Sequence, residues 1–160
     1  MLVRLSNWHR FDSTFEFVKQ YPELKHHKYT KCLNYKKEIL RFYNVVNDLK
    51  CIYQKKHREM NDNYAIKKFY EGYIKSIEKL QDSYSYKPSG TFGGNDFYDY
   101  DKMRMRLSNE NISLLERADY EFCNISFSRG AFFMGCYFAN RELSAICNHF
   151  NILVNEERRK

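Results

Sequence analysis

The chain has few of the residues that interrupt helices. Its 160 residues include two prolines, Pro22 and Pro88, and six glycines. Proline breaks helices and glycine weakens them, so this composition leaves room for long helices. Long apolar runs are also missing, because the longest one, residues 130–139, is flanked by Arg129 and Arg141. That run is too short to span a bilayer, and we expect no contact with a membrane.

Cysteine patterns typical of secreted or metal-binding proteins are absent as well. The five cysteines are odd in number, and none are spaced Cys-x-x-Cys. The first residues lack the apolar region of a secretory signal, so we expect a cytoplasmic protein with reduced thiols. His26, His27 and Cys32 lie close together, but a tetrahedral site needs four convergent ligands. We therefore predict no metal and no cofactor.

Catalytic motifs are scarce. The sequence contains no Gly-x-x-x-x-Gly-Lys-Ser/Thr loop, no nucleophile elbow and no dinucleotide fingerprint, so we predict a protein that is not an enzyme. One alternative stays open, because Arg4 and His9 have an Arg-x4-His spacing. This spacing resembles the motif of HEPN-type ribonucleases, an all-α family. The resemblance implies that the two side chains act on a 2′-hydroxyl and its phosphate.

One apolar seam dominates the second half of the chain. Its members follow one another at alternating steps of three and four residues, and eleven of the twelve are apolar. They are Leu115, Ala118, Phe122, Ile125, Arg129, Phe132, Cys136, Ala139, Leu143, Ile146, Phe150 and Leu153. Such spacing keeps a seam on one side of an α-helix, so it predicts one long helix. A row of small residues, Ala131, Gly135 and Ala139, predicts close approach by another helix.

Arg129 is the single exception in this seam. In one interpretation its stem packs while its head either reaches solvent or pairs with a Glu on a facing helix, as polar seam residues that fix the register do. In the other it lies in a groove and meets a phosphate or a partner's carboxylate.

The positive charge is concentrated in one segment. Residues 19–79 carry fifteen Lys and Arg against seven Asp and Glu, so they hold an excess of +8 in a chain whose net charge is +7. Two apolar stripes run through this segment, one from Leu33 to Tyr53 and one from Ile66 to Leu80, and each has helical spacing. Asp62 or Asn63 is the expected N-cap of the second helix. The segment therefore predicts a basic antiparallel helical hairpin.

The whole chain is predicted to be one all-α domain, a helical bundle of 1–160. We expect a short N-terminal helix in 1–24, the basic hairpin in 25–82, an aromatic and Gly-rich loop in 83–101, and the long C-terminal helix in 102–160. Fourteen Tyr and thirteen Phe accompany a single Trp, and we expect most of these rings in the core.

A basic surface of this kind favours an anionic partner, because Lys and Arg displace counterions from phosphates. We predict binding to nucleic acid, RNA being favoured over DNA, or to a ribonucleoprotein complex, by a monomer or homodimer. The candidate contact residues are Lys28, Lys31, Lys36, Lys37, Lys55, Lys56, Arg58, Lys67, Lys68 and Arg129. A helical scaffold that uses the seam between chains is a second alternative.

Lys, Asn, Tyr, Phe and Ile, which AT-rich codons encode, make up 66 of the 160 residues. In this profile the chain resembles the small accessory inhibitors, anti-CRISPR proteins included, that phages and mobile elements direct against host defence. The resemblance implies binding to a defence complex and transfers no residue roles.

Overall fold

In a computed structural model of the chain, the described residues are 19, 42–85, 99–124 and 126–158. They form four helices, α4 (Phe42–Glu59), α5 (Tyr64–Ser85), α6 (Tyr100–Asn124) and α7 (Phe127–Arg158), and this part of the chain contains no strand. The predicted all-α bundle with a long C-terminal helix is confirmed. The helix expected in 1–24 lies outside the described residues except for Lys19.

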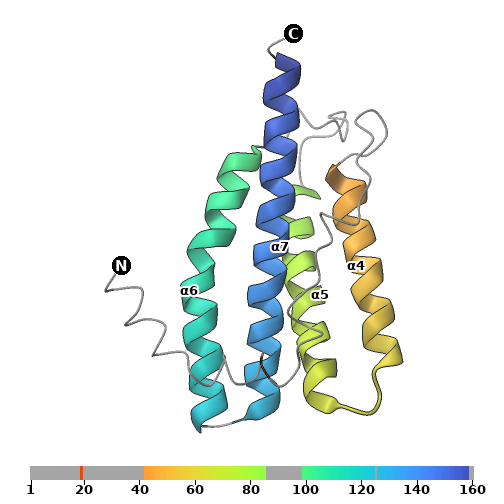
Figure 1. The fold of residues 1–160 in the computed structure, drawn as a ribbon, viewed down its shortest axis with the longest axis vertical. Helices are drawn as coiled ribbons and strands as arrows, with labels where there is room; N and C mark the ends of the chain where they lie inside the picture. The colour runs from red at the N-terminus through yellow and green to blue at the C-terminus, as the bar shows by residue number, and fades with distance from the viewer. Residues whose placement is uncertain (1–18, 20–41, 86–98, 125, 159–160) are drawn as a thin grey trace.

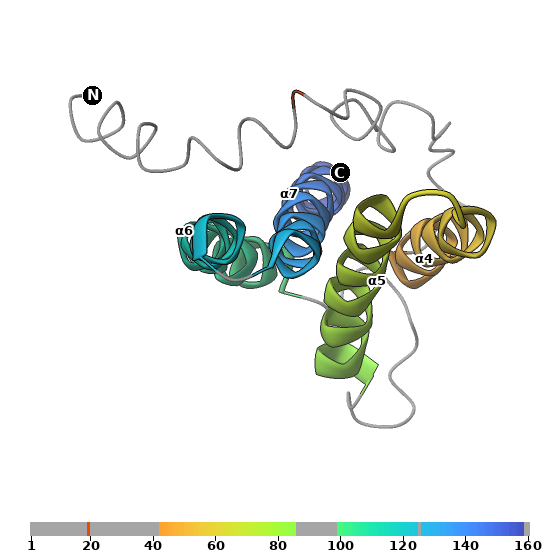
Figure 2. The ribbon, with the colours of Figure 1, turned by 90° about the horizontal axis from the view of Figure 1, so that it is seen from below.

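Helix α7 is the centre of the bundle. It packs extensively against α6 on one side and α5 on the other, whereas α4 packs mainly on α5 (Figures 1 and 2). Successive helices run in opposite directions, so the α4–α5 turn and the α6–α7 turn lie at the same end of the molecule (Figure 1). We call this the turn end.

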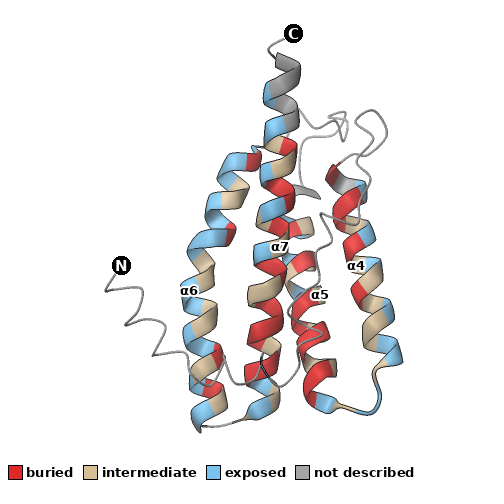
Figure 3. Cartoon of the chain, viewed as in Figure 1, coloured by how far each residue is buried: buried red, intermediate tan, exposed pale blue. Residues whose placement is uncertain are grey.

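The predicted hairpin exists as α4 and α5, joined by residues 60–63. The described members of both apolar stripes face the core. Those at most 7% exposed are Phe42, Val46, Leu49, Tyr53, Ile66, Phe69, Tyr70, Tyr73, Ile77 and Leu80. Figure 3 shows the buried positions in red along one side of α4 and of α5. Asn63 is the N-cap of α5, because its Oδ1 accepts a hydrogen bond from the amide of Ile66 at 3.1 Å. Residues 25–41 of the predicted hairpin fall outside the described ranges.

The prediction of one helix across 102–160 is wrong, because the chain turns back between α6 and α7. The amide of Ser126 donates to the carbonyl of Glu121 at 2.8 Å, and the Ser126 hydroxyl accepts from the amide of Arg129 at 3.3 Å. These bonds satisfy backbone groups at the end of α6 and the start of α7. A seam with 3/4 spacing cannot distinguish one long helix from two antiparallel helices that bury their seams against each other.

Described members of the seam on both helices are buried within the chain. Ala118 of α6 and Ala139, Leu143 and Ile146 of α7 are fully buried. Asn140, also buried, donates to the carbonyl of Leu107 at 3.5 Å, which adds a polar contact between α6 and α7.

Helices α5 and α7 approach each other at two glycines. A Cβ on Gly135 would lie 2.0 Å from the carbonyl oxygen of Phe69, and one on Gly72 would lie 2.0 Å from the carbonyl oxygen of Phe132. Both approaches are to backbone atoms, which cannot rotate away. The small-residue row on α7 therefore serves the close helix contact that its spacing predicts, and Gly72 is its counterpart on α5.

Aromatic rings fill the space between the helices. Tyr53 of α4 and Tyr73 of α5 are stacked with their ring centroids 3.6 Å apart. At the end opposite the turns, Phe42, Tyr100 and Phe150 join α4, α6 and α7, with ring centroids 5.1 to 5.9 Å apart. Tyr100 is the first residue of α6, so the predicted loop of 83–101 is shorter than expected at both ends, and its residues 86–98 lie outside the described part.

Candidate nucleic-acid interface

The structure brings six of the ten predicted contact residues to the turn end. Helix α4 carries three of them in its last turns, α5 carries two in its first turns, and α7 carries one close to its start. In chain order they are Lys55, Lys56, Arg58, Lys67, Lys68 and Arg129. Lys28, Lys31, Lys36 and Lys37 lie outside the described residues.

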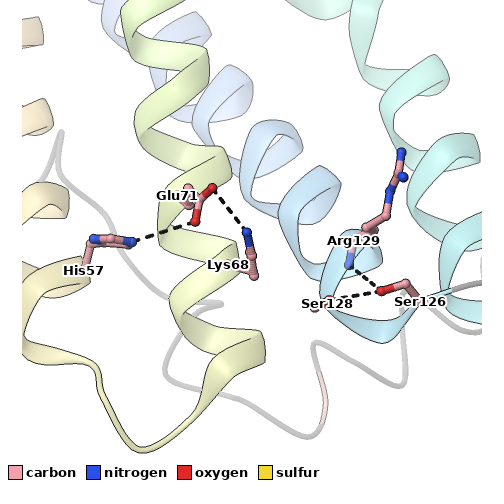
Figure 4. Close-up of polar contacts among 6 residues, drawn as sticks. All are labelled: His57, Lys68, Glu71, Ser126, Ser128 and Arg129. Carbon is pink, nitrogen blue, oxygen red and sulfur yellow. Dashed lines mark hydrogen bonds and ion pairs between the residues drawn. The ribbon is translucent and has the colours of Figure 1, made fainter.

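Part of this positive charge is already engaged. Lys68 lies 3.3 Å from a carboxylate oxygen of Glu71, whose other oxygen is 3.9 Å from His57 (Figure 4). Lys56 lies over the rings of Tyr53 and Tyr70, at 5.7 and 5.9 Å from their centroids. These contacts fix the orientations of the Lys56 and Lys68 ammonium groups, and Glu71 neutralises the charge of Lys68.

The remaining cations of the hairpin are more open. Lys55 and Arg58 are exposed, and neither forms an ion pair within the described part of the chain. Lys67 contacts the side-chain oxygen of Asn61 at 3.4 Å, a neutral group that leaves its charge uncompensated. An anion at this end would therefore meet three cations that have no carboxylate within ion-pair distance.

Arg129 lies on the other side of the turn end, next to α6 (Figure 4). Its Nε is 3.3 Å from Oε1 of Glu121, a carboxylate that is 8% exposed, while the Arg129 side chain is 63% exposed. The interpretation in which Arg129 pairs with a Glu of a facing helix is confirmed. Oε2 of Glu121 has no hydrogen-bond partner among the described atoms, so this buried carboxylate depends on Arg129 for its charge compensation.

Tyr64 is a candidate that the stripe analysis missed. Tyr64 is the first residue of α5 and is 66% exposed. The centroid of its ring lies 5.6 Å from the Lys68 ammonium. The stripe starts at Ile66, so a search for the buried face passes over it. An aromatic residue three positions before a Lys-Lys pair is a signal that would have identified it, because exposed rings beside cations are typical of surfaces that stack bases.

The described hairpin is less basic than its sequence segment. Residues 42–85 carry eight Lys and Arg against six Asp and Glu, whereas residues 20–41 carry six against two. Half of the +8 excess of residues 19–79 therefore lies in a segment outside the described helices.

Comparison with protein-family models, with curated proteins and with solved structures finds no match to this chain. None of the four helices is long and apolar enough to cross a membrane. Across the described ranges, no three His, Cys, Asp or Glu side chains are grouped so that they could hold a metal ion. Arg4 and His9, on which the ribonuclease alternative depends, lie outside those ranges.

Proposed function

We propose that this chain is a non-catalytic, cytoplasmic binding protein whose turn end contacts single-stranded nucleic acid, either free or held in a protein complex. One observation carries the proposal: the exposed Tyr64 has its ring beside Lys68, in the same helical turn as Lys67 and across the α4–α5 turn from Lys55 and Arg58. A ring that stacks a base and cations that bind the adjoining phosphates are the two parts of a sequence-tolerant single-strand site.

The expected energetics divide between these two parts. Stacking one base on an aromatic ring contributes about 1–3 kcal/mol, a contribution that salt weakens little. Each cation that neutralises a phosphate of a single strand adds about 0.7 to the slope of log affinity against log salt concentration. The proposal therefore predicts that removal of Tyr64 lowers affinity at every salt concentration, whereas removal of Lys55 or Arg58 also flattens the salt dependence.

The test is fluorescence anisotropy with labelled single-stranded RNA, the same sequence as DNA, and a duplex. We expect Tyr64→Ala to weaken single-strand binding about tenfold, which corresponds to about 1.4 kcal/mol. The double variant Lys55→Glu/Arg58→Glu should weaken it further. A matched control is Lys102→Glu/Arg141→Glu, which makes the same change in net charge at exposed positions of α6 and α7.

Equal losses in the control and the turn-end variant would mean that net charge alone drives binding, and would refute a site at the turn end. Unchanged binding in Tyr64→Ala would refute the stacking role. RNA is the preferred strand in this proposal, so the RNA probe should bind more tightly than its DNA counterpart.

A narrower form of the proposal is an inhibitor of host defence, in which the nucleic acid is held by a defence ribonucleoprotein. The profile of a small basic chain rich in AT-encoded residues supports this form. Purification of the tagged protein from its native host, followed by extraction of nucleic acid from the eluate, tests it. A co-purified ribonucleoprotein that the turn-end variant fails to retain is the expected result, and equal retention by both proteins would contradict it.

A further inference from the structure

A groove separate from the turn-end surface lies between α5, α6 and α7. It encloses about 790 Å³, within the range of sites that hold small ligands. Its walls include Lys75 and Lys79 of α5 and Arg117 of α6, and α7 contributes Phe132 and Cys136. A second groove of about 530 Å³, toward α4, shares Lys75, Glu78 and Phe132 with it and is also lined by Arg58 of the turn end.

Two of the cations in the larger groove are compensated and two are open. Lys79 lies 3.6 Å from Glu110, and Lys50, at the edge, lies 3.6 Å from Glu78. Lys75 and Arg117 are exposed and form no ion pair with the residues that the structure describes. An anion entering the groove would therefore bind to Lys75 and Arg117 without first breaking an ion pair.

The orientation of Arg117 is set by packing. Its guanidinium carbon lies 4.3 Å above the ring centroid of Phe133, so the planar group rests on an aromatic face and has less freedom to lose when it binds an anion. One wall of the groove is formed by the buried Cys136. Burial raises the pKa of its thiol, while a hydrogen bond with Ser76 and the charges of Arg117 and Lys79 act against that rise. The thiol remains neutral and donates to the carbonyl of Gly72 at 3.4 Å.

The groove combines three kinds of contact. Cations are present for a phosphate, the half-buried ring of Phe132 is present for a planar group, and carboxylates, including Glu78 and Glu110, are present as acceptors. Bases with amino groups donate to such carboxylates while they stack on a ring. A simple inorganic anion would use only the first kind of contact.

We propose that this groove binds a nucleoside monophosphate whose base carries an amino group, with the phosphate at Lys75 and Arg117 and the base against Phe132. The ligand is either a free nucleotide or the 5′-terminal nucleotide of a strand. The proposal does not depend on strand binding at Tyr64, because the two sites share no residue.

Isothermal titration calorimetry with GMP tests the proposal, with UMP, guanosine and inorganic phosphate as comparison ligands. We expect GMP to bind more tightly than all three, because UMP lacks the amino group, guanosine the phosphate, and phosphate the base. Lys75→Gln and Arg117→Gln should each weaken GMP binding about tenfold or more, since each removes a charge-assisted hydrogen bond. Lys102→Gln and Arg141→Gln, exposed cations outside the groove, are the matched controls.

GMP that binds no more tightly than phosphate, or equally well to Lys75→Gln and Arg117→Gln, would overturn the proposal, as would the absence of any GMP binding. Tyr64→Ala should leave GMP binding unchanged, which separates failure of this site from failure at the turn end. Displacement of GMP by a 5′-phosphorylated oligonucleotide, but not by its unphosphorylated form, would identify a strand end as the ligand. GMP that neither oligonucleotide displaces would identify a free nucleotide.

Discussion

Replacing Gly135 with alanine should destabilise the protein, although alanine is the better helix former. In the middle of a helix, alanine is favoured over glycine by about 1 kcal/mol. At Gly135, however, the new Cβ would lie 2.0 Å from the carbonyl oxygen of Phe69 and 2.9 Å from the amide nitrogen of Tyr73. Real Cβ atoms essentially never come closer than 3.0 Å to another heavy atom, so α5 and α7 would have to separate by about 1 Å.

The loss in the free energy of unfolding can be estimated from the packing between α5 and α7 that this separation disrupts. Overpacking in a well-packed core costs about 1–3 kcal/mol and occasionally more, and the upper end applies here because the atoms in conflict belong to backbone. A radial gap of about 1 Å also forfeits a quarter to a half of each dispersion contact across it. After the gain in helix propensity, we expect a net loss of about 2 kcal/mol or more, a fall of about 4–8 °C in Tm for a chain of this size.

Urea denaturation followed by circular dichroism at 222 nm measures this loss. The matched control is Ala145→Gly, at an exposed position of the same helix, which should lose about 1 kcal/mol through propensity alone. If Gly135→Ala raised the free energy of unfolding, propensity would outweigh packing at this site. The close approach of α5 and α7 would then be refuted.

Three further results are expected. Asn63→Ala should lower stability by about 1 kcal/mol, because it removes the side-chain oxygen that caps α5. Arg129→Ala should lower stability by about 1–3 kcal/mol, because it leaves the buried carboxylate of Glu121 without a cation. Burial raises the pKa of the Cys147 thiol from 9.0 to about 12. Burial of the neutral thiol therefore contributes fully to the stability of the fold below pH 9, and this contribution is lost as the pH rises toward 12. At pH 8 a thiol reagent should therefore modify exposed Cys51 well before Cys147.

Each result has its own check. Asp62→Ala, next to the cap, should change stability little, and an equal loss there would contradict the capping role of Asn63. Glu121→Gln combined with Arg129→Ala should recover stability relative to Arg129→Ala alone, because the double variant contains no buried charge; no recovery would contradict the pairing. Equal modification rates of the two cysteines in folded protein, measured by mass spectrometry, would contradict the burial of Cys147.

The two stripes of the hairpin could be predicted from sequence because each is a local pattern. Ile66, Phe69, Tyr73 and Ile77 recur at helical spacing, and burial of that one face determines where the helix packs. The cap at Asn63 follows from chemistry within a single turn. Fold class and the position of the hairpin turn therefore depend on interactions between residues that are near neighbours in the sequence.

The break between α6 and α7 could not be predicted in the same way. The seam keeps its 3/4 spacing through the turn, so its periodicity carries no signal of the break. The hydroxyl of Ser126 caps α7 within a single turn, as Asn63 caps α5, but here an uninterrupted seam pointed to a continuous helix. Tyr64 was missed for a related reason, because a periodicity search finds buried faces and an exposed ring lies outside them.

The turn at Ser126 also creates the groove. On one continuous helix Arg117 and Phe133 would be sixteen residues apart, about 24 Å at 1.5 Å per residue. In the folded chain the Arg117 guanidinium lies 4.3 Å from the Phe133 ring centroid, on the helix that also carries Phe132 and Cys136. The same reversal brings the start of α7, which carries Arg129, to the end where α4 meets α5 (Figure 1). The proposed groove thus depends on tertiary contacts of a seam whose sequence pattern indicates only that it is buried.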